Sequence, residues 1–375
     1  MLMLKKTIAA LSLLSILAAC QNDENPSQPE PKPRQDINLT RAEQEFMDKG
    51  TDFAFRFFDQ VCSTEKEKPN VFVSPLSASL CLSMITNGAT DNTLAEMQDV
   101  LGFPANTFSL DDLNNYNQKL TSALLDLDNT TQLGIANSIW IEEGFKVYDS
   151  FVDVNKKMYD AQVQELDFTS PTAKDVINQW CATQTNNCIK EVIQEIPADV
   201  RMYLINALYF KGIWKSQFDK SATGHDNFTN VDGSQQKVAM MNQTATFNYT
   251  QTDDFSIAEL PYGNEAFSMV ILLPSGDKTL NESLPSLNYE NWKQWSKNMV
   301  RKELQIKLPR FKVEYDKELE EDMIVMGMKD AFDAYKAKFA NMSGAELYIG
   351  LLQQFTYINV DEEGTEAAAV TVGGM

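Results

Sequence analysis

The 375-residue sequence predicts an α+β fold, because helical patterns come first along the chain and most strand patterns come later. Helical spacing is clear at residues 40–61, where Phe46, Phe53, Phe57 and Val61 share one side. Strand-like alternation and turn dipeptides dominate after residue 200. We find no internal repeat and no glycine-rich phosphate loop, so the pattern favours neither a repeat array nor a nucleotide-binding domain.

The remaining helices are predicted in the first half of the chain. Val71 to Val73 is predicted as a short buried strand, and a helix begins directly after it. Ser74 suits the N-cap of that helix and Pro75 suits its first turn, and its apolar pattern continues to Gly88. Three further helices are predicted at residues 93–101, 110–125 and 172–187.

Strands are predicted from apolar or alternating runs, many of them separated by turns such as Asp232-Gly233. The first is Ile135 to Ile141, and a long apolar one is Leu204 to Phe210. The later strands are predicted at residues 237–241, 246–249, 255–260, 267–273 and 304–313.

The charge balance is strongly acidic, with 53 Asp and Glu against 32 Lys and Arg and a formal net charge of −21. No basic stripe offsets this charge. An anionic surface repels nucleic acid, so no nucleic-acid partner is predicted. Beyond that exclusion, the charge bears on solubility more than on mechanism.

Catalytic patterns are weak. His225, the one histidine, lies in a polar segment that is predicted to connect two strands, and no G-x-S-x-G elbow accompanies it. Asp and Glu are abundant, but no EF-hand spacing is present. The sequence therefore predicts a protein that is not an enzyme and that binds no metal and no cofactor.

The first 40 residues are predicted to address and tether the protein. Residues 1–19 combine Lys5 and Lys6 with an apolar stretch that is short for a membrane span, which is typical of a secretory signal. The signal ends in a lipobox-like Leu-Ala-Ala-Cys, which predicts a lipid on Cys20 as the only membrane contact. The proline-rich residues 20–40 are predicted to be a disordered tether. We expect the protein at the bacterial outer membrane or cell surface; an ordinary signal with a chance cysteine is the alternative.

Four other cysteines match no zinc-binding spacing: Cys62, Cys81, Cys181 and Cys188. The last two are seven residues apart on one predicted helix, which separates them by about 10 Å, beyond the reach of a disulfide. Buried free thiols are therefore expected.

Several segments resemble, in chain order, the serpin family of serine protease inhibitors. The most specific are Asn70 to Ser77, Leu204 to Trp214, and Val360 to Ala369, which resembles the hinge of the family's reactive loop. Shorter matches are Leu260 to Tyr262, Met269 to Pro274 and Leu308 to Phe311. The resemblance implies a serpin fold with about eight to nine helices and three β-sheets. It also implies a core at 41–360, a hinge at 361–375, and a scissile bond and last core strands that follow Met375.

In the family, a protease attacks the reactive loop, and the cut loop inserts into the central sheet as a new strand. Residues 365–372 suit such a strand because they are small, lack proline and carry only the charge of Glu366. Side chains along a strand alternate between the two faces of the sheet. Glu366 would therefore lie on the outer face, and the inner face would carry Thr365, Ala367, Ala369, Thr371 and Gly373. The implied hinge residues are Glu362, Glu363, Gly364, Thr365, Glu366, Ala367, Ala368, Ala369, Val370 and Thr371. A flexible alanine-rich tail is the alternative.

Two further groups follow from the resemblance. A polar cluster at the opening of the sheet consists of Ser74, Ser77, Asn206 and Gln354, where the family usually places a histidine instead of Gln354. The region where the loop first enters the sheet consists of Trp214, Arg310 and Glu362. Arg310 and Glu362 match a charged pair of the family; an exposed pair would contribute little to stability, and its use would be to position the hinge.

The sequence thus predicts a monomeric suicide inhibitor whose partner is a serine endopeptidase, with cysteine endopeptidases as a further class. One alternative is a non-inhibitory serpin that binds or carries a ligand, but the small side chains of Ala367 to Ala369 argue against it. A surface adhesin or glycan-binding lipoprotein would need an aromatic platform, and a hydrolase would depend on His225.

Overall fold

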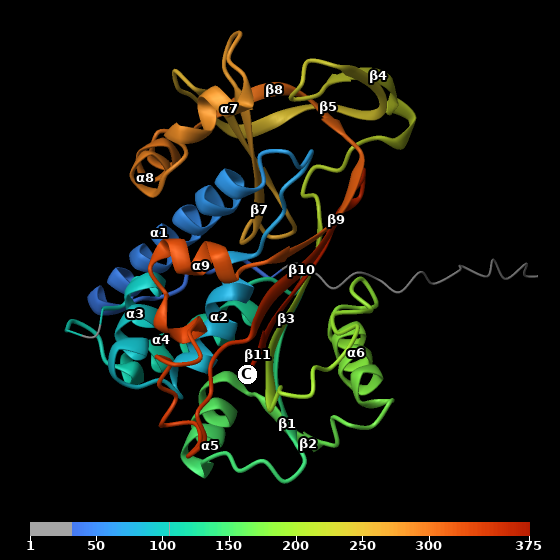
Figure 1. The fold of residues 1–375 in the computed structure, drawn as a ribbon. Helices are drawn as coiled ribbons and strands as arrows, with labels where there is room; N and C mark the ends of the chain where they lie inside the picture. Colours follow the sequence, from blue (N-terminus) through green and yellow to red (C-terminus); the bar gives the residue numbers. More distant parts are fainter. Residues whose placement is uncertain (1–31, 105) are drawn as a thin grey trace, which may run out of the picture.

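A computed structural model describes residues 32–104 and 106–375 (Figure 1). Its helices are α1 (Arg41–Thr64), α2 (Pro75–Thr86), α3 (Asp91–Leu101), α4 (Leu110–Asp126), α5 (Asp149–Tyr159), α6 (Ala173–Gln184), α7 (Leu280–Ser283), α8 (Tyr289–Lys297) and α9 (Glu320–Met326). Its strands are β1 (Gln132–Glu142), β2 (Gln162–Leu166), β3 (Met202–Ile213), β4 (Gly224–Thr229), β5 (Gln235–Gln251), β6 (Phe255–Pro261), β7 (Ser268–Pro274), β8 (Val300–Pro309), β9 (Phe311–Glu318), β10 (Leu351–Val360) and β11 (Gly364–Gly374). The predicted α+β class is confirmed.

The first two helices begin where the sequence predicts. Thr40 and Glu43 form a capping box at the start of α1, and the four apolar residues predicted to share one side are its buried residues. Ser74 caps α2 and Pro75 occupies its first turn. Most residues of α2 are buried because the helix packs against the central sheet.

The central sheet has six strands in the order β2-β1-β3-β11-β10-β9. Its neighbours pair antiparallel, except that β1 and β2 are parallel. In Figure 1, α2 lies on one side of β3 and β11, and α6 lies on the other. Both faces of the middle of this sheet are therefore covered, which favours small and apolar residues there.

The second sheet has five strands, β4-β5-β6-β7 in order with β8 paired to β5. The described residues thus form two sheets where three were expected, because the long strand β5 pairs with β4 along its first part and with β6 and β8 along the rest. The strands predicted at 237–241 and 246–249 are both parts of β5. Pairing with β8 continues across the polar residues between them, so polarity did not end the strand.

Three other predictions of secondary structure are wrong. The strand predicted at 304–313 is divided at Arg310 into β8 and β9, which belong to different sheets. Val71 to Val73 is not a strand among the described residues; the Phe72 carbonyl accepts a hydrogen bond from the Thr356 side chain instead. His225 lies in β4 and pairs with Ala239, so it is not in a connecting segment.

The helix predicted at 172–187 ends at Gln184, because Asn186 and Asn187 have positive φ angles of 49° and 62°. Cys188 therefore follows the helix. The four cysteines of the described residues are free, as predicted, but only Cys81 and Cys181 are buried.

Part of the predicted tether lies against the folded body. The Lys32 amide donates to Asn129 Oδ1, and its ammonium lies 3.0 Å from an Asp126 carboxylate oxygen. The Asn264 side chain also donates to the Lys32 carbonyl. The predictions for residues 1–31, including Cys20, lie outside the described residues. No helix within the described ranges is long and apolar enough to cross a membrane.

Candidate functional site: the hinge strand

The predicted hinge residues form most of β11, an interior strand of the central sheet (Figure 1). Gly364 to Gly374 pair with Ile213 to Tyr203 of β3, and Thr365 to Gly374 pair with Val360 to Leu351 of β10. A proline would interrupt one of these ladders, and this segment has none. Gly364 also fits a close approach, since a Cβ there would lie 2.0 Å from the Gly212 carbonyl oxygen.

The two faces of β11 meet different surroundings. On the face toward α2, the Thr371 hydroxyl contacts Ser77 and a Cβ at Gly373 would meet Ile85. On the face toward α6, the buried side chains belong to an apolar cluster that includes residues of α6; they are Ala368, Val370 and Val372. Small residues thus meet the tightly packed α2, and larger aliphatic residues meet α6.

The sheet-opening cluster brings three of its four predicted residues together around Thr371. The Gln354 amide accepts from the Ser74 N–H at 2.7 Å and donates to the Ser74 carbonyl at 3.0 Å. The same amide nitrogen donates to Thr371 Oγ1 at 2.8 Å, and Ser77 Oγ lies 2.8 Å from that hydroxyl. Gln354 therefore ties the start of α2 to β11 with neutral hydrogen bonds, of which the one to Thr371 is fully buried and the two to Ser74 are partly buried.

The fourth residue, Asn206, makes a different contact. Its Nδ2 donates to Asn137 Oδ1 on β1 at 2.8 Å, and its buried Oδ1 has no hydrogen-bond partner among the described residues. Asn206 pairs with Thr371 only through the backbone register. No sequence pattern singles out Asn137, because its contact with Asn206 depends on the alignment of β1 with β3.

Glu362 and Arg310 meet as predicted, and only the arginine of the pair is exposed. The Glu362 side chain is 2% exposed, whereas that of Arg310 is 48% exposed. Glu362 Oε1 accepts from Arg310 Nη2 at 2.5 Å and from Thr223 Oγ1 at 2.6 Å. Burial by itself would raise the pKa of Glu362, but these two donors outweigh it and hold the pKa below its ordinary value.

Trp214 secures the turn that precedes β11, which we call the hinge turn (residues 361–363). Its indole stacks on Tyr262 with ring centroids 4.5 Å apart, and its Nε1 donates to the Asp361 carbonyl at 2.8 Å. Its backbone N–H donates to the Glu363 carbonyl. The Tyr262 hydroxyl donates to Thr365 Oγ1 at 2.6 Å. Sequence reasoning missed Thr223, which no local pattern marks, and it named Tyr262 only within a short family match and gave it no role.

The described residues contain no group of three or more His, Cys, Asp or Glu that could hold a metal ion. His225 is exposed on the edge strand β4. The structure therefore offers no support for hydrolase chemistry at this residue.

Comparisons with known proteins agree with this geometry. The family described as Serpin (serine protease inhibitor) matches residues 48–375. The chain is 36% identical to Serpin B6 of Macaca fascicularis over 317 aligned residues. The alignment covers 82% of this chain and 83% of Serpin B6. It is 34% identical over 336 aligned residues to the leukocyte elastase inhibitor of Xenopus tropicalis. That alignment covers 86% of this chain and 88% of the inhibitor. The crystal structure of a thermophilic serpin, Tengpin, in the latent state superposes with a TM-score of 0.82 at 32% identity, covering 91% of each chain.

Proposed function

The chain belongs to the serpin family, and from that premise we propose that it is a suicide inhibitor of serine endopeptidases, with cysteine endopeptidases as a further target class. Serpins are mostly protease inhibitors rather than enzymes. The observation that carries the proposal is the fit of residues 364–374 as an interior strand with a neighbour on each edge.

In the proposed mechanism the protease performs the chemistry and this chain supplies the trap. The nucleophilic Oγ or Sγ of the protease attacks the carbonyl carbon of the scissile bond. The C–N bond breaks, the amine leaves with the proton taken from the nucleophile, and the acyl group stays on the protease. Insertion of the freed hinge into the sheet then carries the bound protease along and distorts its active site before water can release it.

The driving force for insertion comes from forming a complete strand. Ten residue pairs join β11 to β10 and eleven join it to β3. If about ten of the new backbone hydrogen bonds contribute about 1 kcal/mol each, the gain is of order 10 kcal/mol. This gain is comparable to the stability of a whole domain, which is enough to distort a second protein.

The composition of the strand supports inhibition over a non-inhibitory role. Ala368 and Ala369 are each 2% exposed on opposite faces of the inserted strand, where a charged side chain would be buried without a partner. A protein that never inserted its loop would not need small residues at these positions. Neutral or apolar side chains continue to Val372.

The test is to mix the natural protein, with any residues that follow Met375, with trypsin-like, elastase-like and papain-like proteases. We expect a covalent adduct that survives SDS, and a loop-nicked form that melts at a higher temperature than the intact form. Clean cleavage without an adduct and without a thermal gain would instead identify a non-inhibitory serpin.

We further propose that the protein is a monomer that a lipid on Cys20 anchors at the bacterial surface. The proposal is supported by the lipobox-like sequence and the apolar stretch before it. Replacing Cys20 with serine should abolish labelling by a fatty acid and release the protein from the membrane fraction. Unchanged membrane association would contradict the lipid anchor.

A further inference from the structure

Glu366 is the only charged residue of β11, and it points toward the α6 side of the sheet. Its Oε1 accepts a hydrogen bond from the Tyr209 hydroxyl at 2.6 Å. Tyr209 lies on β3 and is 7% exposed. Glu366 itself is partly buried, and a hydrogen bond to a charged group is about twice as strong as a neutral one.

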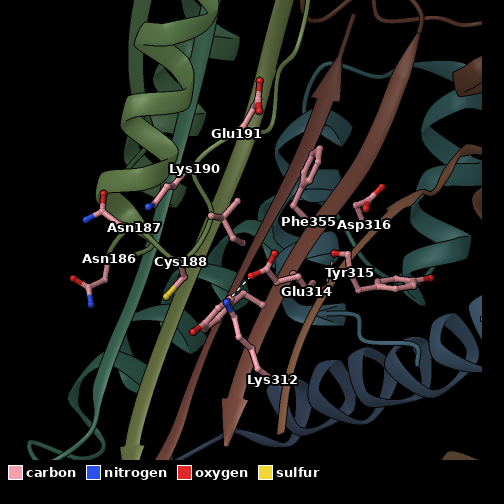
Figure 2. A pocket seen from close by; sticks show the side chains of 13 residues that line it. Asn186, Asn187, Cys188, Lys190, Glu191, Lys312, Glu314, Tyr315, Asp316 and Phe355 are labelled. Carbon is pink, nitrogen blue, oxygen red and sulfur yellow. Dashed lines mark hydrogen bonds and ion pairs between the residues drawn. The ribbon is translucent and has the colours of Figure 1, made fainter. Parts of the chain in front are cut away.

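A second donor comes from the turn after α6. Asn186 Nδ2 donates to the Tyr209 hydroxyl at 3.2 Å and lies 3.4 Å from Glu366 Oε1. Figure 2 shows Asn186 and Asn187 beside a cavity of about 590 Å³, which separates this turn from the Lys312 and Glu314 side chains of β9. The carboxylate is therefore contacted from β3 and, at a longer distance, from the turn after α6.

The contact also depends on the register of the inserted strand. Glu366 pairs with Lys211 and Ala368 pairs with Tyr209, so Tyr209 reaches Glu366 diagonally. A slip of one residue would turn Glu366 to the opposite face. A slip of two residues would move its carboxylate away from the Tyr209 hydroxyl by about 7 Å.

We propose that Tyr209 and Asn186 are positioning residues that receive the Glu366 carboxylate when the hinge enters the sheet and thereby fix the register of insertion. This inference rests on the proposed inhibitory function. Burial and the neighbouring carboxylate raise the pKa of Tyr209, so its hydroxyl stays protonated and remains a donor. The Tyr209 hydroxyl donates its one hydrogen to Glu366, which the pairing of β11 with β3 brings within reach.

The test uses the natural protein with Tyr209→Phe, which removes one oxygen and keeps the ring. Each inhibitor molecule ends either as an SDS-stable adduct or as a cleaved, released product, and the ratio of the two reports the speed of insertion. We expect this ratio to fall about tenfold, while the melting temperature of the intact form stays unchanged. Asn186→Ala should lower the ratio less, because its contacts are longer.

The matched control is Tyr203→Phe. Tyr203 lies on the same strand and is fully buried, but its hydroxyl has no hydrogen-bond partner in the described structure. Its ratio of adduct to cleaved product should equal that of the wild type. Combining Tyr209→Phe with Glu366→Ala should cause no more loss than either change alone, whereas a general packing role of Tyr209 would make the losses additive.

If the wild type forms the adduct and Tyr209→Phe has the same ratio of adduct to cleaved product, the inference is overturned and the proposed function stands. If the wild type forms no adduct, the proposed function fails, and the loop-nicked protein still tests the contact. A smaller thermal gain on nicking in Tyr209→Phe than in Tyr203→Phe would then support the contact, and equal gains would refute it. Should Tyr209→Phe fail to fold, Glu366→Ala gives the same readouts.

Discussion

The hinge strand is held at two places that differ in charge and in access to water. At the hinge turn, the contacts are ionic and partly exposed: Glu362 meets Arg310, and Glu363 meets Lys220. Near the far end of the strand, Thr371 makes neutral hydrogen bonds to Gln354 and Ser77 that are fully buried.

We expect the charged contacts of the hinge turn to hold the strand less strongly than the neutral hydrogen bonds at Thr371 do. Water and salt screen an exposed ion pair, so such a pair contributes little. A buried neutral group that loses its partner cannot be hydrated again, and its loss costs about 1–3 kcal/mol. We therefore expect insertion to depend most on what is buried along the strand and least on the ions at its start.

The largest effect is expected where a charge is forced into the buried strand. Ala369 is 2% exposed, and Ala369→Arg would place an unpaired charge on the buried face of β11 that is turned toward α2, at a cost of several kcal/mol. Gel analysis after protease addition should show complete cleavage and no adduct. Tyr335→Arg, at a residue that is 95% exposed, is the control and should trap protease normally. A normal adduct with Ala369→Arg would contradict burial as the controlling factor.

The next effect concerns the neutral cluster. Thr371→Val keeps the shape of the side chain but removes the hydroxyl that Gln354 and Ser77 contact, so the inserted form should lose about 1–3 kcal/mol. The melting temperature of the loop-nicked protein measures this loss, and the intact form should be unaffected. Thr371→Ser, which keeps the hydroxyl, should retain most of the stability. Equal losses in both variants would point to packing rather than hydrogen bonding.

A smaller effect is expected at Glu362, which combines the two kinds of contact because its buried carboxylate faces a half-exposed arginine. Its pKa is lower in the folded protein than its ordinary value of 4.5, so its stabilisation is complete above about pH 4.5 and is lost as the pH falls through the folded pKa. Glu362→Gln should cost about 1 kcal/mol at pH 7. Denaturant titrations at several pH values should show the difference from wild type shrinking below pH 4.5. A difference that stayed constant with pH would exclude the carboxylate as its source.

The sequence predicted those parts of the fold that depend on local pattern. The buried side of α1 and the start of α2 follow from helical spacing and capping residues. The suitability of residues 365–372 for a strand follows from their size and the absence of proline. Gln354 was placed in the sheet-opening cluster through the family resemblance, and the structure brings its amide to Ser74 and Thr371.

What the sequence did not predict depends on partners that are distant along the chain. The continuity of β5 depends on its pairing with β8, and the strand break at Arg310 depends on two sheets meeting there. Tyr209 and Glu366 are 157 residues apart, and neither lies in a pattern that suggests the other. Burial of Glu362 was missed because a charged residue in a turn is usually exposed.

The smallest effect is expected for the Lys220–Glu363 pair. Its two charged atoms are 2.5 Å apart, but both side chains are 66% exposed. The hydrogen bond from Lys220 lowers the pKa of Glu363, yet solvent screens the pair, so Lys220→Ala should leave protease trapping and melting temperature unchanged. Arg310→Ala is the matched comparison, and it should destabilise the nicked protein because the Glu362 carboxylate that it leaves behind is buried. If Lys220→Ala proved the more damaging of the two, charge rather than burial would govern how the hinge strand is held.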